Sequence, residues 1–291
     1  MIKTRLSGGL GNQMFEYAAA RALALRNNTE VQLDLTYLLD RTPRPKRWHF
    51  TFRNYDLDVF AIHATIAKKN ETPLFFLGKI GLFADKALRR VFKPKGTEKY
   101  YQFDPSFLTL PDGTYLDGGW QSPKYFAGYE DVIQKDFTLK NPIPEKTEAL
   151  VAEIRNSESV CVHLRRGDFL KVALHTVCDE DYYKRGIAEV AKHTSFEKIY
   201  VFSDDIAWCR ENLSLGYPTE FVSDDYSGFK STGHMYLMSQ CKYFVIANSS
   251  FSWWSAWLSK RAGKLVIAPK HWFSDHSIDT SDVTPKEWIR V

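Results

Sequence analysis

The second half of the chain alternates short apolar runs with stretches of helical length, and this alternation restricts the possible folds more than any other feature. The runs have the length of β-strands and are SVCVHL at 159–164, KIYVFS at 198–203, EFVS at 220–223, KYFVIA at 242–247 and KLVIAP at 264–269. Strands that alternate with helices in this way predict an α/β fold, with a parallel sheet and crossover helices on both of its faces.

The first part of the chain contains one strand, turn, helix and strand unit. IKTRLS at 2–7 precedes a glycine turn, a helix is expected from about Asn12 to Arg26, and VQLDL at 31–35 follows as the second strand. A length of 291 residues suits two domains better than one hydrophobic core. The prolines of the segment 141–144 indicate a linker. We therefore expect two lobes with a cleft, residues 1–142 and residues 143–291.

Polar clusters follow the predicted strands of the second half. HLRRGD at 163–168 ends the first strand, SDD occurs at 203–205 and again at 223–225, and NSS follows at 248–250. The carboxyl ends of parallel strands line the crevice where open α/β sheets bind their ligands. Their shared position predicts one ligand site built from several loops.

The two arginines of HLRRGD have the chemistry of a diphosphate site. Strand alternation places His163 and Arg165 on one face, and Arg166 follows directly. Guanidinium groups stay charged and match phosphate oxygens bidentately, so the pair can hold a diphosphate and stabilise its charge as it leaves. The alternative for Arg166 is an ion pair with Asp168.

The NSS cluster opens a predicted helix. Asn248, Ser249 and Ser250 are good helix caps, and the free N–H groups at a helix start form a natural anion site together with the helix dipole. The backbone from Ser249 to Phe251 is the expected phosphate seat. The tryptophans that follow, at 253, 254 and 257, are expected to pack against the sheet.

The first acidic pair has two possible functions. Asp204 and Asp205 are hard ligands that could hold a magnesium ion against a diphosphate. Because the arginines and the helix start already supply positive charge, we expect no metal. Ser203 and one of the two aspartates are then expected to contact the nucleotide or to orient the arginines.

The glycine turn near the N-terminus partly matches a dinucleotide-binding fingerprint. Gly9 and Gly11 form G-x-G, and Asp34 closes the next strand, but Met14 stands where the third glycine belongs. An NAD-dependent sugar epimerase or dehydrogenase would need a third glycine or a Tyr-x-x-x-Lys pair beside the turn, and neither is present there. This alternative is therefore disfavoured.

Composition excludes several other classes. A net charge of +4 with scattered Lys and Arg argues against a nucleic-acid-binding protein. The basic stretches at 41–50 and 86–95 are read as solvated surface, with a peripheral membrane contact as the alternative. The four cysteines lack zinc-site spacing and are expected to be reduced. MIKTRLSGGL lacks the apolar core of a signal peptide, so we expect a cytoplasmic protein.

Four motifs together resemble those of glycosyltransferase family 11, the α-1,2-fucosyltransferases, in its bacterial form. They are GGLGNQMFEYAAARAL at 8–23, HLRRGD at 163–168, SDDIAWC at 203–209 and NSSFSWWSAWL at 248–258. The resemblance covers nearly the whole chain, as far as APKHWF at 268–273. An HLRRGD-like motif also occurs in α-1,6- and protein O-fucosyltransferases, so the specificity lies in the full set.

The resemblance implies a GT-B-like architecture of two Rossmann-like lobes, with GDP-fucose held mainly by the C-terminal lobe and a β-galactoside acceptor by the other. It implies an inverting, metal-independent transfer of L-fucose to the 2-hydroxyl of a terminal galactoside, without a cofactor. Arg165 matches the essential diphosphate-binding arginine, and His163 a residue near the nucleoside. Asn12 and Gln13 match the polar end of a glycine turn that faces the donor, and there the glycines let the backbone approach a sugar diphosphate.

Three positions depart from the family pattern, and the first is Gly119, which stands where an aromatic residue is common and would widen the acceptor side. Glu16 replaces the usual Gln, and we expect it at a solvated helix position. His234 stands where the family generally has an acidic residue that reads guanine, so Asp224 or Asp225 is the expected substitute.

The base that accepts the proton of the acceptor hydroxyl stays open in the sequence. Asp168 is the nearest candidate, followed by Glu16 and Asp34, and proton transfer to the diphosphate itself would need no side chain. A GDP-sugar-binding protein without transferase activity is the remaining alternative function.

Overall fold

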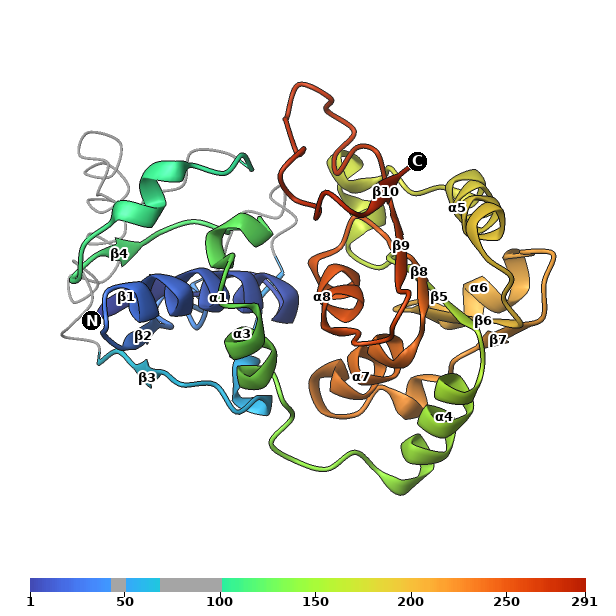
Figure 1. The fold of residues 1–291 in the computed structure, drawn as a ribbon, viewed down its shortest axis with the longest axis horizontal. Helices are drawn as coiled ribbons and strands as arrows, with labels where there is room; N and C mark the ends of the chain where they lie inside the picture. The colour runs from blue at the N-terminus through green and yellow to red at the C-terminus, as the bar shows by residue number, and fades with distance from the viewer. Residues whose placement is uncertain (43–50, 69–100) are drawn as a thin grey trace. The chain divides into compact units, whose positions relative to one another are not determined.

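The computed structural model describes residues 1–42, 51–68 and 101–291, which form two compact units (Figure 1). One unit comprises Met1–Lys140 and Ser281–Val283, and the other comprises Asn141–Thr280 and Thr284–Val291. The division at Lys140 and Asn141 lies at the start of the predicted linker. The return of Ser281–Val283 to the first unit has no counterpart in the prediction from sequence.

The first unit is built on a four-stranded parallel sheet in the order β3-β2-β1-β4. Strand β1 pairs with β2 in a register that places Ile2 opposite Val31. The predicted strand, helix and strand unit is present, and the helix begins slightly earlier than expected. The elements are β1 (Ile2–Arg5), α1 (Leu10–Arg26), β2 (Val31–Asp34), β3 (Thr65–Ile66), β4 (Tyr115–Leu116) and α3 (Glu130–Asp136), with 3-10 turns at Leu57–Val59, Pro105–Thr109 and Pro123–Phe126.

The second unit contains a six-stranded parallel sheet in the order β10-β9-β8-β5-β6-β7. From β5 the chain adds strands in one direction, and from β8 it adds them in the other. This is the doubly wound Rossmann order, and its switch point lies between β5 and β8. The strands are β5 (Ser159–Leu164), β6 (Lys198–Ser203), β7 (Thr219–Phe221), β8 (Tyr243–Val245), β9 (Leu265–Ala268) and β10 (Ile289–Arg290).

Helices cover both faces of this sheet, as the sequence predicts. In Figure 1, α7 and α8 lie on one side of it and α5 and α6 on the other. Alternate residues of β5, beginning with Val160, pack in one hydrophobic cluster with residues of α5. On the opposite face Trp253 and Trp254 are fully buried, which confirms the packing role expected for them. The helices are α4 (Glu145–Asn156), α5 (Glu180–His193), α6 (Ile206–Asn212), α7 (Thr232–Gln240) and α8 (Ser250–Leu258), with 3-10 turns at Phe169–Lys171, Ala173–His175, Asp224–Tyr226 and Phe229–Ser231.

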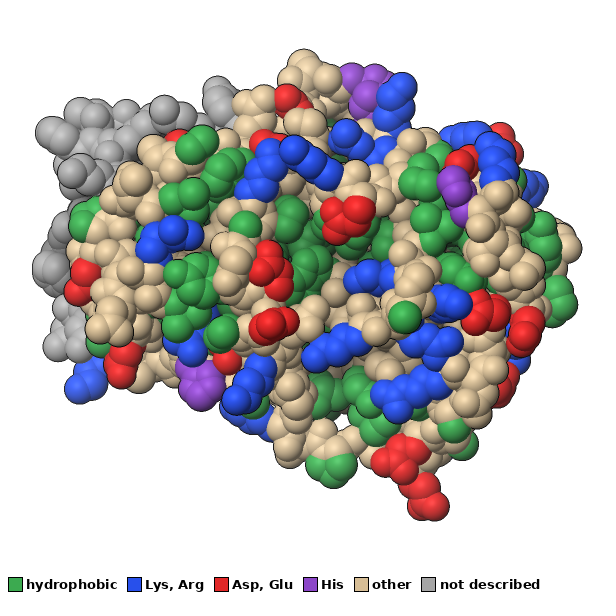
Figure 2. Space-filling model, viewed as in Figure 1, with side chains coloured by type: hydrophobic (Ala, Val, Ile, Leu, Met, Phe, Trp, Pro, Cys, Tyr) green, Lys and Arg blue, Asp and Glu red, His purple; other side chains and the backbone are tan. Residues whose placement is uncertain are grey.

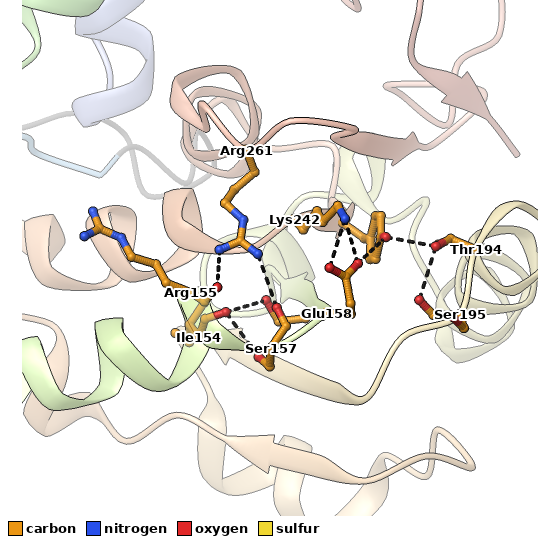
Figure 3. Close-up of polar contacts among 10 residues, drawn as sticks. Ile154, Arg155, Ser157, Glu158, Thr194, Ser195, Lys242 and Arg261 are labelled. Atoms are coloured by element: carbon orange, nitrogen blue, oxygen red, sulfur yellow. Dashed lines mark hydrogen bonds and ion pairs between the residues drawn. The ribbon is translucent and has the colours of Figure 1, made fainter.

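A polar network ties the amino ends of the strands together (Figure 3). Glu158, just before β5, pairs with Lys242, just before β8, at 2.8 Å. Tyr243 donates its hydroxyl to the same carboxylate at 2.5 Å, and these hydrogen bonds lower the pKa of Glu158. Arg261 donates to the backbone oxygen of Arg155, at the end of α4. This edge of the sheet is thus closed by structural contacts.

Charges of both signs are mixed on the face shown in Figure 2, where Lys and Arg alternate with Asp, Glu and apolar side chains. This agrees with the small net charge of +4. In the described part of the chain, no helix combines the length and the apolar character that crossing a bilayer requires.

Candidate functional site

Three of the four polar clusters named from the sequence follow the central strands β5, β6 and β8 at the switch point of the second sheet, and the SDD at 223–225 follows the edge strand β7. β5 and β8 are parallel neighbours, with Val162 opposite Val245, so the residues that follow them leave the same edge. The SDD at 203–205 follows β6, the other neighbour of β5, where Leu164 pairs with Ser203. A switch point of this kind is where doubly wound sheets bind nucleotides.

Arg165 is held in place by carboxylates from two different loops. Its Nε and Nη2 donate to Oδ1 of Asp168 at 3.1 and 2.7 Å, and its Nη1 lies 3.1 Å from Oδ2 of Asp204. The guanidinium also lies over the ring of Phe169, 5.7 Å from its centre. These contacts engage one N–H on each nitrogen, which leaves one donor on each of Nη1 and Nη2 directed elsewhere.

Arg166 is fixed separately, against α6. Its Nε donates to Oδ2 of Asp205 at 3.1 Å, and its guanidinium carbon stacks 3.3 Å from the ring centre of Trp208. The alternative of an ion pair between Arg166 and Asp168 is therefore wrong, because Asp168 pairs with Arg165. The direction of the side chains in the loop after β5 decides which arginine pairs with Asp168. This direction cannot be deduced from the spacing of the residues in the sequence.

Asp204 connects the two arginines. Its Oδ1 accepts the backbone N–H of Arg166 at 2.9 Å while its Oδ2 faces Arg165. A Cβ added to Gly167 would lie 2.6 Å from this Oδ2, so only glycine leaves room for the carboxylate. Asp205 caps α6 and its N–H bonds to Ser203 Oγ at 3.0 Å. The sequence predicts that Ser203 and one of the aspartates contact the nucleotide or orient the arginines. The structure shows the second of these functions, because Asp204 and Asp205 both contact the arginines.

The charge balance of this cluster differs from the expectation. Two arginines are contacted by three carboxylates, Asp168, Asp204 and Asp205, which gives a formal charge of −1. The cluster would therefore bind an anion through N–H groups that are held in a fixed direction, and not through an excess of positive charge. In the described ranges, no group of three His, Cys, Asp or Glu side chains is placed to hold a metal ion.

His163 is buried beside the start of α8. It is 4% exposed, its ring centre lies 5.8 Å from that of Phe251, and its Nδ1 has no hydrogen-bond partner among the described residues. Burial, helped by Arg165 and His234, lowers the pKa of His163 to about 3. The imidazole is therefore neutral at physiological pH and can act as a hydrogen-bonding group, not as a cation.

The buried neutral state of His163 predicts a pH-dependent contribution to stability. The folded pKa of about 3 lies below the ordinary 6.5, so the unfolded chain binds more protons between these values and stability falls as the pH drops. Replacing His163 with Phe should remove this contribution. The measurement is the free energy of unfolding in urea for the wild type and the variant at pH 7 and at pH 5. Lowering the pH should reduce this free energy more in the wild type than in the variant. An unchanged difference would contradict the assignment.

His234 occupies the first turns of α7 and is bonded to the backbone. Its Nε2 lies 3.0 Å from the carbonyl oxygen of Ser223, and its ring packs edge-on against Phe202 at 5.6 Å. Burial lowers its pKa. Asp224 and Asp225, the expected substitutes for an acidic residue here, are exposed in the turn that follows Ser223.

Asn248 lines a pocket beside Arg165, and its side chain is also bonded to the protein's own backbone. It is 4% exposed, and its Nδ2 donates to the backbone oxygens of His175 and Trp272 at 3.0 and 2.9 Å. Its Oδ1 accepts from the thiol of Cys178 at 3.5 Å. The amide thus holds neighbouring loops at the end of β8, and its predicted contact with the donor stays a prediction.

Ser249 caps α8, which begins at Ser250 as the motif predicts. Its Oγ accepts the backbone N–H of Phe251 at 3.3 Å. That N–H belongs to the predicted phosphate seat, and it is already engaged inside the protein. A pocket opens nearby, beside Arg165, and its lining includes Arg166, Phe169, His175, Trp208 and Asn248.

The N-terminal glycine turn depends on Gly8 rather than on Gly9 and Gly11, the two glycines of the G-x-G pattern. Gly8 has a φ of +67°, and a Cβ there would lie 2.3 Å from Asn12 Nδ2. Gly9 is the N-cap of α1, and Gly11 is buried in its first turn. The turn is therefore a compact entry to the helix.

The side chain of Gln13 is bonded within the first unit, and its predicted contact with the donor stays a prediction. Gln13 is fully buried, and its Nε2 donates to the backbone oxygens of Gly8 and Asn54 at 3.0 and 2.8 Å. Its Oε1 accepts the N–H of Asp56 at 2.9 Å. Asn12, which is half-buried, accepts from Gln121 at 3.2 Å. The pair thus anchors other segments of the first unit to the glycine turn.

Glu16 and Asp34 are buried, so the solvated position expected for Glu16 is wrong. Glu16 accepts the N–H and the hydroxyl of Ser7 at 2.9 and 2.5 Å. Asp34 accepts from Thr36 N–H at 2.9 Å and from the Tyr115 hydroxyl at 2.6 Å. Both carboxylates have structural partners, which weakens their candidacy as the catalytic base.

Comparison with known proteins gives one family and one fold. The model of glycosyl transferase family 11 matches residues 98–291. An alpha-1,2-colitosyltransferase of Escherichia coli is 34% identical, covering 100% of this chain and 99% of that protein. The galactoside 2-alpha-L-fucosyltransferase Sec1 of Mus musculus is 26% identical over 89% of this chain and 64% of its own length. The crystal structure of NodZ alpha-1,6-fucosyltransferase soaked with GDP-fucose superposes with a TM-score of 0.51 at 16% identity, covering 92% and 94% of the two chains, which establishes a shared fold.

Proposed function

The chain belongs to glycosyltransferase family 11, with the GT-B-like α/β fold that its motifs implied, and we propose that it transfers L-fucose from GDP-fucose to the 2-hydroxyl of a terminal β-galactoside. The α-1,2 linkage is supported by the activities of its relatives, which include an alpha-1,2-colitosyltransferase and a galactoside alpha-(1,2)-fucosyltransferase. The reaction would invert the anomeric carbon and release GDP.

The observation that carries this proposal is the fixed guanidinium of Arg165 at the switch point. Asp168 and Asp204 orient it from two loops, so its remaining donors need no rearrangement when a diphosphate arrives. Donors that are preorganised toward developing charge stabilise a transition state more than mobile ones. Arg165 would bind the departing diphosphate as the bond to the sugar breaks.

The proton of the acceptor hydroxyl needs a route that the predicted bases do not readily supply. Asp168 is engaged by Arg165, and the carboxylates of Glu16 and Asp34 are engaged by neighbours in the first unit. We therefore assign Asp168 the function of positioning Arg165. Transfer of the proton to the departing diphosphate is the route that uses no further side chain.

GDP-colitose is the second candidate donor. The colitosyltransferase is 34% identical over its full length, against 26% for the fucosyltransferase Sec1, which matches over 64% of its own length. Colitose is fucose without the 3-hydroxyl, so the same diphosphate site would serve both donors. Selection between them would lie in contacts with that one hydroxyl.

The activity test supplies the purified protein with GDP-fucose or GDP-colitose and a panel of β-galactosides, with and without EDTA. We expect GDP release with one donor, an α-1,2-linked product by NMR, and equal rates in EDTA. Binding of the donor without GDP release would favour the non-catalytic alternative. Loss of activity in EDTA that magnesium restores would show that a divalent ion balances the carboxylate excess around the arginines.

A further inference from the structure

Phe169 connects Arg165 to a series of ring contacts in the loop after β5. The guanidinium of Arg165 lies over the Phe169 ring, 5.7 Å from its centre. The ring of His175 stacks on Phe169, with ring centres 4.7 Å apart and an angle of 23° between the planes. His175 in turn contacts Phe273, at 5.6 Å between ring centres. The contacts therefore lead from the guanidinium to a segment that follows β9.

Two other loops hold His175 in place. Asn248, which follows β8, donates through Nδ2 to the backbone oxygen of His175 at 3.0 Å. Ser274, which follows β9, donates from its backbone N–H to Leu174 and from its hydroxyl to Ala173, each at 3.0 Å. These hydrogen bonds join the turn that carries His175 to the ends of two strands of the parallel sheet. The ring of His175 therefore has a fixed base.

His175 takes part in this stack as an uncharged ring. Burial lowers the pKa of His175 from the ordinary 6.5, and the opposing effect of Asp168 is smaller. The imidazole is therefore neutral at pH 7, and nearly parallel aromatic rings at this separation attract one another. Phenylalanine has a ring of similar shape without a charge, so it is the conservative substitute at this position.

Both arginines of HLRRGD combine a carboxylate contact with an aromatic contact. Arg166 donates to Asp205 and lies 3.3 Å from the ring centre of Trp208, and Arg165 donates to Asp168 while it lies over Phe169. Hydrogen bonds to a carboxylate act along the edges of the guanidinium and leave its plane free to tilt. An aromatic face restricts this tilt, because guanidinium groups stack on aromatic rings.

We propose that Phe169 and His175 are positioning residues, which hold the guanidinium plane of Arg165 in the direction of the departing diphosphate. The inference rests on the proposed function, in which Arg165 stabilises that diphosphate. Neither ring needs to touch the donor in order to act in this way. The effect should fall on kcat, because donors that point in the wrong direction lose stabilisation of the transition state.

The first test measures kcat, the KM for GDP-fucose and the affinity for GDP in single variants. Phe169→Leu keeps an apolar side chain and removes the ring, so kcat should fall by about tenfold to a hundredfold, as for a displaced catalytic group. KM and the affinity for GDP should stay within about threefold of the wild type. His175→Ala should act in the same direction. Phe169→Tyr and His175→Phe should recover most of the lost rate.

The second test combines Phe169→Leu with Arg165→Lys. Lysine has no guanidinium plane, so the ring should matter little in that background and the double variant should have a kcat within about threefold of Arg165→Lys. Two losses that multiply would instead assign Phe169 a structural effect that does not pass through Arg165, and would overturn the inference.

The control is Phe196→Leu, at the amino ends of the strands. Phe196 is half-buried like Phe169 and contacts another ring, that of Tyr217, at 4.6 Å between ring centres. This substitution should leave kcat within about twofold of the wild type, because the ring lies at the edge of the sheet opposite to the site. The thermal transition of each variant checks its folding.

Phe169 and His175 also line the pocket beside Arg165, so direct contact with the donor is the rival explanation. A higher KM or a weaker affinity for GDP with unchanged kcat in Phe169→Leu would support that contact and overturn the inference. Wild-type kcat in Phe169→Leu would overturn it as well and leave the proposed function intact. If the wild-type protein transfers no sugar, the proposed function and the inference both fall.

Discussion

Replacing Arg165 with Lys is expected to lower kcat by about 100- to 1000-fold, the loss typical of one preorganised donor to a developing anion. Lysine keeps the charge but lacks the planar fork, so it cannot contact Asp168 and Asp204 and still direct donors toward a diphosphate. The measurement is steady-state turnover with GDP-fucose and a galactoside, together with the affinity for GDP. Arg165→Ala should be at least as inactive, but it leaves two carboxylates without their partner.

The control for this experiment is Arg155→Lys at the opposite edge of the sheet (Figure 3). Arg155 donates through Nε to Gln240 at 2.8 Å on the exposed surface, far in the fold from the strand ends that carry the site. Its replacement should leave kcat within about twofold of the wild-type value, since exposed contacts of this kind contribute little. A thermal transition near that of the wild type in both variants excludes global unfolding. Normal turnover in Arg165→Lys would refute the assignment.

The parallel sheet of the second unit could be predicted because its central strands are buried on both faces. Such strands appear in sequence as continuous apolar runs, and β5, β6, β8 and β9 all lie within the predicted runs. β3 and β10 were not predicted, since each has two paired residues and no periodic pattern. The strand order that creates the switch point comes from tertiary packing, which no local pattern encodes.

The residues of the site could be predicted more readily than their roles. Strand ends place Arg165, Asp204 and Asn248 at one edge, and the motifs named all three. Whether a polar side chain faces a ligand or satisfies the protein's own backbone depends on loops distant in sequence. Asn248 reaches His175 and Trp272, and the hydrogen bonds of Gln13 to the 54–56 segment have the same character.

The burial of Glu16 also could not be predicted from the sequence. A charged residue in a helix is ordinarily read as solvent-facing, but α1 is buried on most of its surface, as its alanine run at 18–20 indicates in retrospect. The carboxylate is tolerated because Ser7 supplies both an N–H and a hydroxyl to it. A helix that is buried on most of its surface carries little amphipathic signal, so the pattern could not separate its faces.

Replacing Asp204 with Asn is expected to lower kcat by about tenfold to a hundredfold without unfolding the protein, as expected when the geometry of a catalytic donor is loosened. Asp204 is a positioning residue, because it holds the Nη1 of Arg165 and the backbone N–H of Arg166 at once. The amide keeps an acceptor for the N–H but loses the ionic contact with Arg165. Glu189→Gln is the control and should leave kcat unchanged, since Glu189 pairs with the exposed Lys192 on α5.

Gly167 gives an independent way to move the same carboxylate. Its φ is not in the left-handed region, so alanine is compatible with the backbone, but the added Cβ would lie 2.6 Å from Asp204 Oδ2 and must displace it. Gly167→Ala should therefore lower kcat much as Asp204→Asn does. Because both act on one contact, the double variant should be little worse than either single variant, a coupling that a double-mutant cycle measures directly. Additive losses would show that Gly167 and Asp204 act on the reaction separately and that the carboxylate does not orient Arg165.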